Sequence, residues 1–156
     1  GAHINPAVSF LFLLKKEMTF RLFGIYLVAQ LLGAAVASLL LDLLFPNTGL
    51  GVTLPAGSWE VSFGVEFIFT AFLGLGILIL RHRVHLWQLA IAIGTLIGLE
   101  AYFGGPISGA SMNPARSFGP SLISGNWQVH WMYWLAPIFG IAVSHFIIQI
   151  SSKKNA

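Results

Sequence analysis

A ten-residue motif occurs twice in the sequence, and this repetition constrains the fold more than any other feature. Residues 109–118 (GASMNPARSF) match residues 1–10 (GAHINPAVSF) at seven of ten positions. Each copy contains Asn-Pro-Ala, an order typical of a helix start, because asparagine is a favoured N-cap and proline suits the first helical position. An internal repeat indicates two structurally related units. We therefore expect helices that begin after Asn5 and after Asn113.

The composition is that of a membrane protein. Hydrophobic residues make up 56 % of the 156 residues, charged residues make up 8 %, and the mean hydropathy is +0.83. Soluble domains carry about 25 % charged residues. A chain of this length and composition holds four or five spans of about 20 residues. It has no cysteine, which excludes disulfides and thiolate metal sites, and no basic run of the kind that binds nucleic acid.

The apolar segments differ in length, and this difference predicts their roles. Residues 5–14 are too few to cross a bilayer and are expected to be re-entrant. Residues 104–112, rich in glycine and serine, are expected to form the loop before the second half-helix. That half-helix is expected to stop at Gly119-Pro120 or at Ser124-Gly125-Asn126. Full spans are expected at residues 18–45, 59–80, 86–103 and 130–150.

The positive charges indicate how these spans are oriented. Residues 15–21, residues 81–85 and a polar tail at residues 151–156 contain seven of the eight Lys and Arg residues. The turn-rich loop at residues 46–58 contains none. Cytoplasmic loops of membrane proteins are enriched in these residues. We therefore expect both basic segments and the tail to lie in the cytoplasm, and the protein to lie in the cell membrane.

The two motifs are expected to enter the membrane from opposite faces. Three full spans separate them, and an odd number of spans makes the repeat inverted. Non-helical backbone at membrane depth is tolerated only against protein or a water-filled cavity. Two helix N-termini that meet there form a positive centre. A pore lined by exposed carbonyls around such a centre admits neutral hydrogen-bonding solutes and opposes cations and protons.

The same symmetry predicts the domain organisation. Residues 59–150 contain a second unit of two spans, a half-helix and a span, whereas residues 1–45 contain only a half-helix and a span. By comparison with the second unit, two spans of roughly 60–80 residues in total are expected to be absent from the N-terminus. Residues 1–156 are thus expected to form a single, partial transmembrane channel domain.

The paired motifs, with Gly-Pro after the second, resemble those of the aquaporin, or major intrinsic protein, family. The resemblance extends over the whole chain. It implies an all-α membrane protein with six spans and two half-helices, of which this sequence has four spans and both half-helices. It also implies a homotetramer in the lipid bilayer with one water-conducting pore per subunit. No cofactor, metal or nucleic-acid partner is expected.

The resemblance assigns roles to individual residues. Asn5 and Asn113 match the donors that hold a passing water at the pore centre, and Arg116 matches the constriction arginine. Glu66 matches a carboxylate that accepts from backbone N–H groups of the second motif's loop, and Gln30 is expected to support the first half-helix. The expected pore centre comprises Asn5, Pro6, Ala7, Asn113, Pro114 and Ala115, and the expected pore-lining carbonyls belong to Gly1, Ala2, His3, Gly109 and Ser111.

The selectivity filter departs from the pattern of strict water channels. Ala101 stands where they commonly have histidine, and Ala110 occupies a backbone-carbonyl position of the filter. A lone arginine at membrane depth costs about 2.5–3.5 kcal/mol, which favours a cavity-facing Arg116. Ala101 implies a wider constriction and favours a broader facilitator of glycerol, urea, ammonia or peroxide. Ser117 stands where glycerol facilitators typically have aspartate, and it favours a water channel.

A non-conducting structural membrane protein is a further candidate, although the intact motifs and Arg116 speak against it. An enzyme is not expected, because no Ser/His/Asp order, metal cluster or phosphate loop occurs. Glu100 is expected either to brace residues 104–105 or to face a neighbour. For His82 and His85, a pH gate competes with the interpretation as ordinary solvated loop histidines.

Overall fold

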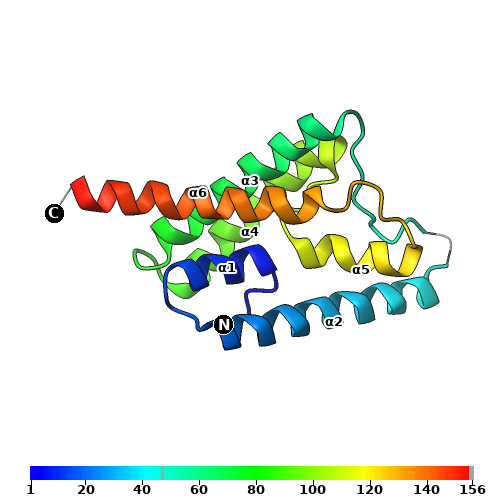
Figure 1. Ribbon diagram of the computed structural model, residues 1–156, viewed down its shortest axis with the longest axis horizontal. Coiled ribbons are helices and arrows are strands. Elements are labelled where there is room, and N and C mark those ends of the chain that lie inside the picture. The colour runs from blue at the N-terminus through cyan, green and yellow to red at the C-terminus, as the bar shows by residue number, and fades with distance from the viewer. Residues whose placement is uncertain (47, 155–156) are drawn as a thin grey trace.

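The computed structural model describes residues 1–46 and 48–154, and every regular element within them is an α-helix (Figure 1). Two helices are short, α1 (Pro6–Leu14) and α5 (Pro114–Ser124). Four are long and apolar enough to cross a membrane: α2 (Phe20–Leu44), α3 (Trp59–Leu80), α4 (Leu86–Ser108) and α6 (Met132–Lys154). The all-α fold expected from the sequence is confirmed.

Side-chain caps explain where these helices begin. Asn5 Oδ1 accepts a hydrogen bond from the first turn of α1 at 2.8 Å. Asn113 Oδ1 accepts from two N–H groups of the first turn of α5, at 3.0 and 3.3 Å. The hydroxyls of Thr19 and Ser58 cap α2 and α3 in the same manner. Each cap satisfies N–H groups that have no partner within their own helix.

Helix α4 continues beyond its predicted end at residue 103. The glycines and the proline of residues 104–106 favoured a loop, but they lie within the helix. A Cβ at Gly104 would lie 2.6 Å from the Phe69 ring of α3, so this glycine allows the two helices to pack closely. The helix ends only before Gly109, whose φ of +82° is left-handed and favours glycine. The prediction of a loop was therefore wrong for residues 104–108, and the loop comprises only residues 109–112 of the expected range.

The structure also defines the C-terminal ends of α5 and α6. Helix α5 passes Gly119-Pro120 and stops before Gly125, which has a φ of +73° and is the later of the two expected ends. Helix α6 continues through Lys154, so residues 151–154 of the predicted polar tail are helical. Asn47 of the predicted loop and the tail residues Asn155 and Ala156 lie outside the described residues.

The two short helices lie between the long ones and connect them (Figure 1). Helix α3 packs against α4 and α6, α2 packs against α5 and α1, and α1 also packs against α6. A buried cluster where α1, α3 and α6 meet contains Ala7, Leu11, Leu78 and Ile141. Helices α1 and α5 thus join α2 to the rest of the bundle, and their N-terminal ends face each other near its centre.

Gly119 sets how closely α5 approaches α2. A Cβ at this position would overlap the carbonyl of Ala34 and lie 2.7 Å from Ser38 Oγ. We expect Gly119→Ala to lower the free energy of unfolding by about 1–3 kcal/mol, the usual cost of overpacking, and to lower the melting temperature in detergent. Gly105→Ala is the control, because a Cβ there meets nothing within 4 Å. Equal melting of the two variants would contradict this account.

An ion pair joins the loop after α1 to the loop after α3. Both terminal nitrogens of Arg81 donate to the carboxylate of Glu17, one of them at 2.7 Å. This hydrogen bonding lowers the pKa of Glu17 below its usual value. The Arg81 guanidinium also lies 5.3 Å from the centre of the Phe12 ring. The two basic segments at residues 15–21 and 81–85 therefore lie on the same side of the bundle.

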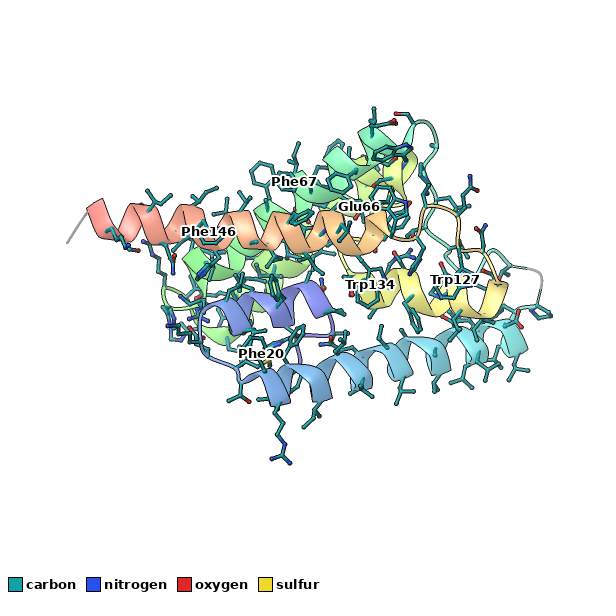
Figure 2. All side chains as sticks on the ribbon, in the orientation of Figure 1. Phe20, Glu66, Phe67, Trp127, Trp134 and Phe146 are labelled. Carbon is teal, nitrogen blue, oxygen red and sulfur yellow. The ribbon has the colours of Figure 1, made fainter. Side chains whose placement is uncertain are left out.

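His130 links α5 to the start of α6. Its Nε2 accepts from the Trp134 indole N–H at 3.1 Å, and its Nδ1 lies 3.2 Å from Ser121 Oγ. Figure 2 shows Trp134 and Trp127 beside α5. Burial lowers the pKa of this imidazole below its usual value of 6.5. Because a protonated ring cannot accept from Trp134, the folded protein binds this proton less readily than the unfolded chain does.

This arrangement predicts a loss of stability in acid. The contribution of His130 is complete above the histidine pKa of the unfolded chain, about 6.5, and declines as the pH falls through the lower pKa of the folded state. We expect His130→Gln, which does not titrate, to reduce the fall in melting temperature between about pH 7.5 and pH 5. His82→Gln, at an exposed histidine, should leave that fall unchanged. A His130→Gln curve that follows the wild type would contradict the prediction.

Candidate functional site

The two motif loops are hydrogen-bonded to each other at the centre of the bundle. Asn5 Nδ2 donates to the Met112 carbonyl at 2.8 Å, and Asn113 Nδ2 donates to the Ile4 carbonyl at 2.8 Å. Each asparagine therefore caps its own helix with Oδ1 and reaches the opposite loop with Nδ2. An amide Nδ2 carries two hydrogens. Within the described residues, one N–H of each asparagine remains for a molecule in the adjacent cavity.

The two loops also share a backbone conformation. In the first loop φ is +60° at Ala2 and +54° at Ile4, and in the second it is +44° at Ala110 and +51° at Met112. The members of each equivalent pair are separated by the same 108 residues as the two asparagines. Left-handed backbone is uncommon at residues other than glycine and persists where the surrounding structure imposes it. The sequence repeat is thus also a repeat of backbone geometry.

Glu66 of α3, whose position is labelled in Figure 2, holds the second loop by hydrogen bonds. Its Oε1 accepts from the Ser111 N–H and from Ser108 Oγ, both at 2.8 Å, and its Oε2 accepts from the Met112 N–H at 2.6 Å. The side chain is fully buried, and a buried carboxylate requires such donors. Glu66 therefore fixes two successive peptide groups, and these directly precede the peptide group whose Met112 carbonyl Asn5 binds.

Gln30 of α2 contacts the first half-helix through a serine. Ser9 Oγ donates to the Asn5 carbonyl at 3.1 Å, accepts from Gln30 Nε2 at 3.0 Å and lies 3.1 Å from His3 Nδ1. Because the only hydroxyl hydrogen of Ser9 goes to a carbonyl, His3 must donate from Nδ1. The His3 ring stacks on Phe12 with centroids 4.4 Å apart. The first loop is thus held through side chains, whereas the second is held directly at its backbone.

A cavity of about 820 Å³ lies beside both motif loops. The loops supply its polar wall, and α3 and α4 supply an apolar wall. On α4, Ala101 follows Ile93 and Ile97 at the four-residue spacing of one helix face. A second cavity, of about 630 Å³, lies between the loops and α2 and shares Asn113 and Arg116 with the first. The two motif loops therefore line both cavities and lie between them.

Most of the predicted site residues line the larger cavity. Pro6, Ala7 and Pro114 do not, because they are buried in the first turns of the short helices. Ala115 and Gln30 line the smaller cavity, and Glu66 lies behind the second loop. The predicted site residues on the wall of the larger cavity are Gly1, Ala2, His3, Asn5, Ala101, Gly109, Ala110, Ser111, Asn113 and Arg116.

Arg116 gives this region a positive charge. Its side chain starts in the first turn of α5 and lines both cavities. Its Nη1 donates to the carbonyl of Gly51, in the loop between α2 and α3. The partial positive charges of two helix N-termini add to that of the guanidinium. The arrangement offers donors to neutral oxygen-bearing molecules and repels cations.

Glu100 does not have the bracing role that the sequence suggested. It is 5 % exposed, and within the described part of the chain neither of its carboxylate oxygens has a hydrogen-bond partner. Residues 104–105, which it was expected to brace, belong to the same helix. The bracing prediction was therefore wrong, and the burial of Glu100 also argues against a side chain that faces outward.

Several residues that shape the site were missed from the sequence. The repeat itself could have indicated Ile4 and Met112, because they occupy equivalent positions before the two asparagines. Tyr133 lies in the last predicted span, and its sequence context did not indicate that its hydroxyl donates to the Ser108 carbonyl at 2.6 Å. Nothing in the sequence marked Thr53, because a loop has no periodicity that shows which residues face inward.

Known proteins resemble this chain over nearly all of its length. The profile of the family described as Major intrinsic protein matches residues 1–148. Aquaporin TIP3-1 of Zea mays is 36 % identical over 96 % of this chain and 59 % of its own length. Aquaporin-4 of Homo sapiens is 38 % identical over 92 % of this chain and 47 % of its own length. The chain therefore spans about half the length of these curated relatives.

A solved structure has the same fold. The X-ray structure of the aquaglyceroporin from Plasmodium falciparum superposes with a TM-score of 0.82 at 25 % sequence identity. The superposition covers 93 % of this chain and 70 % of that one. The arrangement of long and short helices described above is thus shared with a protein of known structure.

Proposed function

Because the chain belongs to the major intrinsic protein family, whose members are membrane channels for water or small solutes, we propose that it conducts water passively and excludes ions and protons. The observation that carries this proposal is the crossed pair of asparagine hydrogen bonds at the meeting point of two helix N-termini. Each asparagine keeps one N–H for the cavity that Arg116 also lines.

The proposed mechanism follows from the hydrogen-bonding capacity of these groups. A water between Asn5 and Asn113 accepts one N–H from each, which occupies both of its lone pairs. That water cannot accept a proton from a neighbouring water, so the chain of waters carries no proton across the centre. The helix N-termini and Arg116 raise the electrostatic cost of a cation at the same point. Neither the interrupted proton transfer nor this electrostatic cost opposes the passage of neutral water.

A broader facilitator of glycerol and other small neutral solutes is the second candidate. It is favoured by the small side chain of Ala101, which leaves the α4 wall of the cavity apolar and open beside Ile97. Stopped-flow light scattering on proteoliposomes distinguishes the two candidates. A water channel gives fast shrinkage in both sucrose and glycerol, with slow re-swelling in glycerol. Fast re-swelling in glycerol would instead establish the broader facilitator.

The assembly and orientation belong to the same proposal. Many large apolar side chains of the long helices are exposed, which fits a subunit surrounded by lipid and by other subunits in a homotetramer. The basic segments at residues 15–21 and 81–85, linked by Glu17 and Arg81, are assigned to the cytoplasmic side of the cell membrane. We propose that the protein transports neutral solutes and that it has no catalytic activity.

A further inference from the structure

We infer that Thr53, in the loop between α2 and α3, is a positioning residue for Arg116, an inference that rests on the proposed channel function. Most loop residues lie at the surface, but Thr53 is only 2 % exposed. Its hydroxyl donates to Ser117 Oγ, on the first turns of α5, at 2.7 Å. One threonine thus attaches the loop to the half-helix that carries Arg116.

The hydrogen bond from Thr53 is the first of a directional series. Ser117 Oγ lies 2.5 Å from Ser111 Oγ, and Ser111 Oγ donates to the Asn113 carbonyl at 2.8 Å. A carbonyl can only accept, and a hydroxyl has one hydrogen to donate. Ser111 must therefore donate to Asn113, Ser117 to Ser111, and Thr53 to Ser117. The series connects the loop to the pore-centre asparagine.

The attachment of Thr53 also places the acceptor of Arg116. Gly51, two residues earlier, presents the carbonyl that accepts from the Arg116 guanidinium. On its other side Thr53 packs against the backbone of the second motif, since a Cβ at Gly109 would lie 3.1 Å from Thr53 Cα. Thr53 is therefore held on two sides, which fixes the short segment that carries the Gly51 carbonyl.

Loss of the Thr53 hydroxyl should release this segment and leave the rest of the loop in place. The other end of the loop has its own attachment, because the Ala56 N–H donates to the Ile107 carbonyl at 2.9 Å. Without a fixed Gly51 carbonyl, Arg116 gains freedom to move within the cavities that it lines. The expected consequence is a change in selectivity between water and a larger neutral solute, in a protein that still folds.

The transport test compares variants of the full chain in proteoliposomes. We expect Thr53→Val to change the ratio of glycerol to water permeability by about threefold, the effect of one hydrogen bond. Thr53→Ser, which keeps the hydroxyl, should match the wild type. Thr48→Val, at an exposed threonine of the same loop, is the matched control. An unchanged ratio in Thr53→Val would overturn the inference.

A double-mutant comparison tests whether Thr53 acts through Arg116. If it does, Thr53→Val should cause no further change in a protein that already carries Arg116→Val, because residues that act together are not additive. An equal change in both backgrounds would overturn the positioning role. A purely structural effect of Thr53 would give such an equal change.

A second readout does not depend on transport. Hydrogen exchange of the backbone amides of residues 50–54 should be about tenfold faster in Thr53→Val and unchanged in Thr53→Ser and Thr48→Val. If the wild type fails to accelerate water or glycerol flux, the proposed function fails, and hydrogen exchange still decides whether Thr53 anchors the loop. Unchanged exchange in Thr53→Val would overturn the anchor itself.

Discussion

Replacement of Glu66 by alanine should lower the free energy of unfolding by at least about 3 kcal/mol, because three buried donors would each lose an acceptor at about 1–3 kcal/mol apiece. The donors are the N–H groups of Ser111 and Met112 and the hydroxyl of Ser108. Without Glu66 the Met112 carbonyl is no longer held for Asn5. We therefore expect the variant to lose both thermal stability and water conduction.

Two further variants make the Glu66 prediction specific. Glu66→Gln keeps one accepting oxygen but presents an NH₂ group to a backbone N–H, so its melting temperature should lie between those of the wild type and Glu66→Ala. Glu60→Ala removes an exposed carboxylate from the first turn of the same helix and should melt close to the wild type. The prediction fails if Glu66→Ala melts like Glu60→Ala in detergent.

The second large effect is expected at Arg116. Arg116→Val should raise glycerol permeability by about tenfold, equivalent to a barrier lowered by about 1.4 kcal/mol, because it removes both the bulk and the charge of the side chain from the cavity. Cation leakage should rise in the same variant, since the cavity loses the guanidinium charge and keeps the weaker partial charges of the helix N-termini. Solute uptake and ion flux into proteoliposomes measure the two effects.

Two controls separate the charge of Arg116 from its shape. Arg116→Lys keeps the charge but loses the planar, forked guanidinium, so cation exclusion should persist while glycerol permeability rises. Arg83→Val, in the exposed loop between α3 and α4, should change neither glycerol permeability nor cation exclusion. Glycerol and cation permeabilities of Arg116→Val that equal those of the wild type would remove Arg116 from the filter.

The parts of the fold that depend on local sequence were predictable. Asparagine and proline define the starts of α1 and α5 within each motif, and the span at residues 59–80 agrees with α3. The end of α4 was not predictable in this manner. Gly104 favours a loop when only the local sequence is considered, but it lies in a helix because Phe69 of α3 packs against it. Tertiary packing decided that boundary.

The site was predictable where the repeat or the family resemblance marked a residue. The repeat singled out Asn5 and Asn113, although not the hydrogen bonds that each makes to the opposite loop. Contacts between distant, non-periodic segments left no signal. The attachment of Thr53 to Ser117 is one example, because the residues are 64 positions apart. The burial of Glu100 also left no signal in the sequence, because it depends on the packing around α4.

The central claim is that the crossed asparagines and Arg116 form a pore that passes water and blocks protons. Stopped-flow osmotic shrinkage of proteoliposomes that contain the full chain and a trapped pH-sensitive dye measures both fluxes in one preparation. The account predicts water permeability about tenfold above that of empty liposomes, with proton permeability unchanged. Water permeability equal to that of empty liposomes, or a proton permeability that rises with it, would contradict the account.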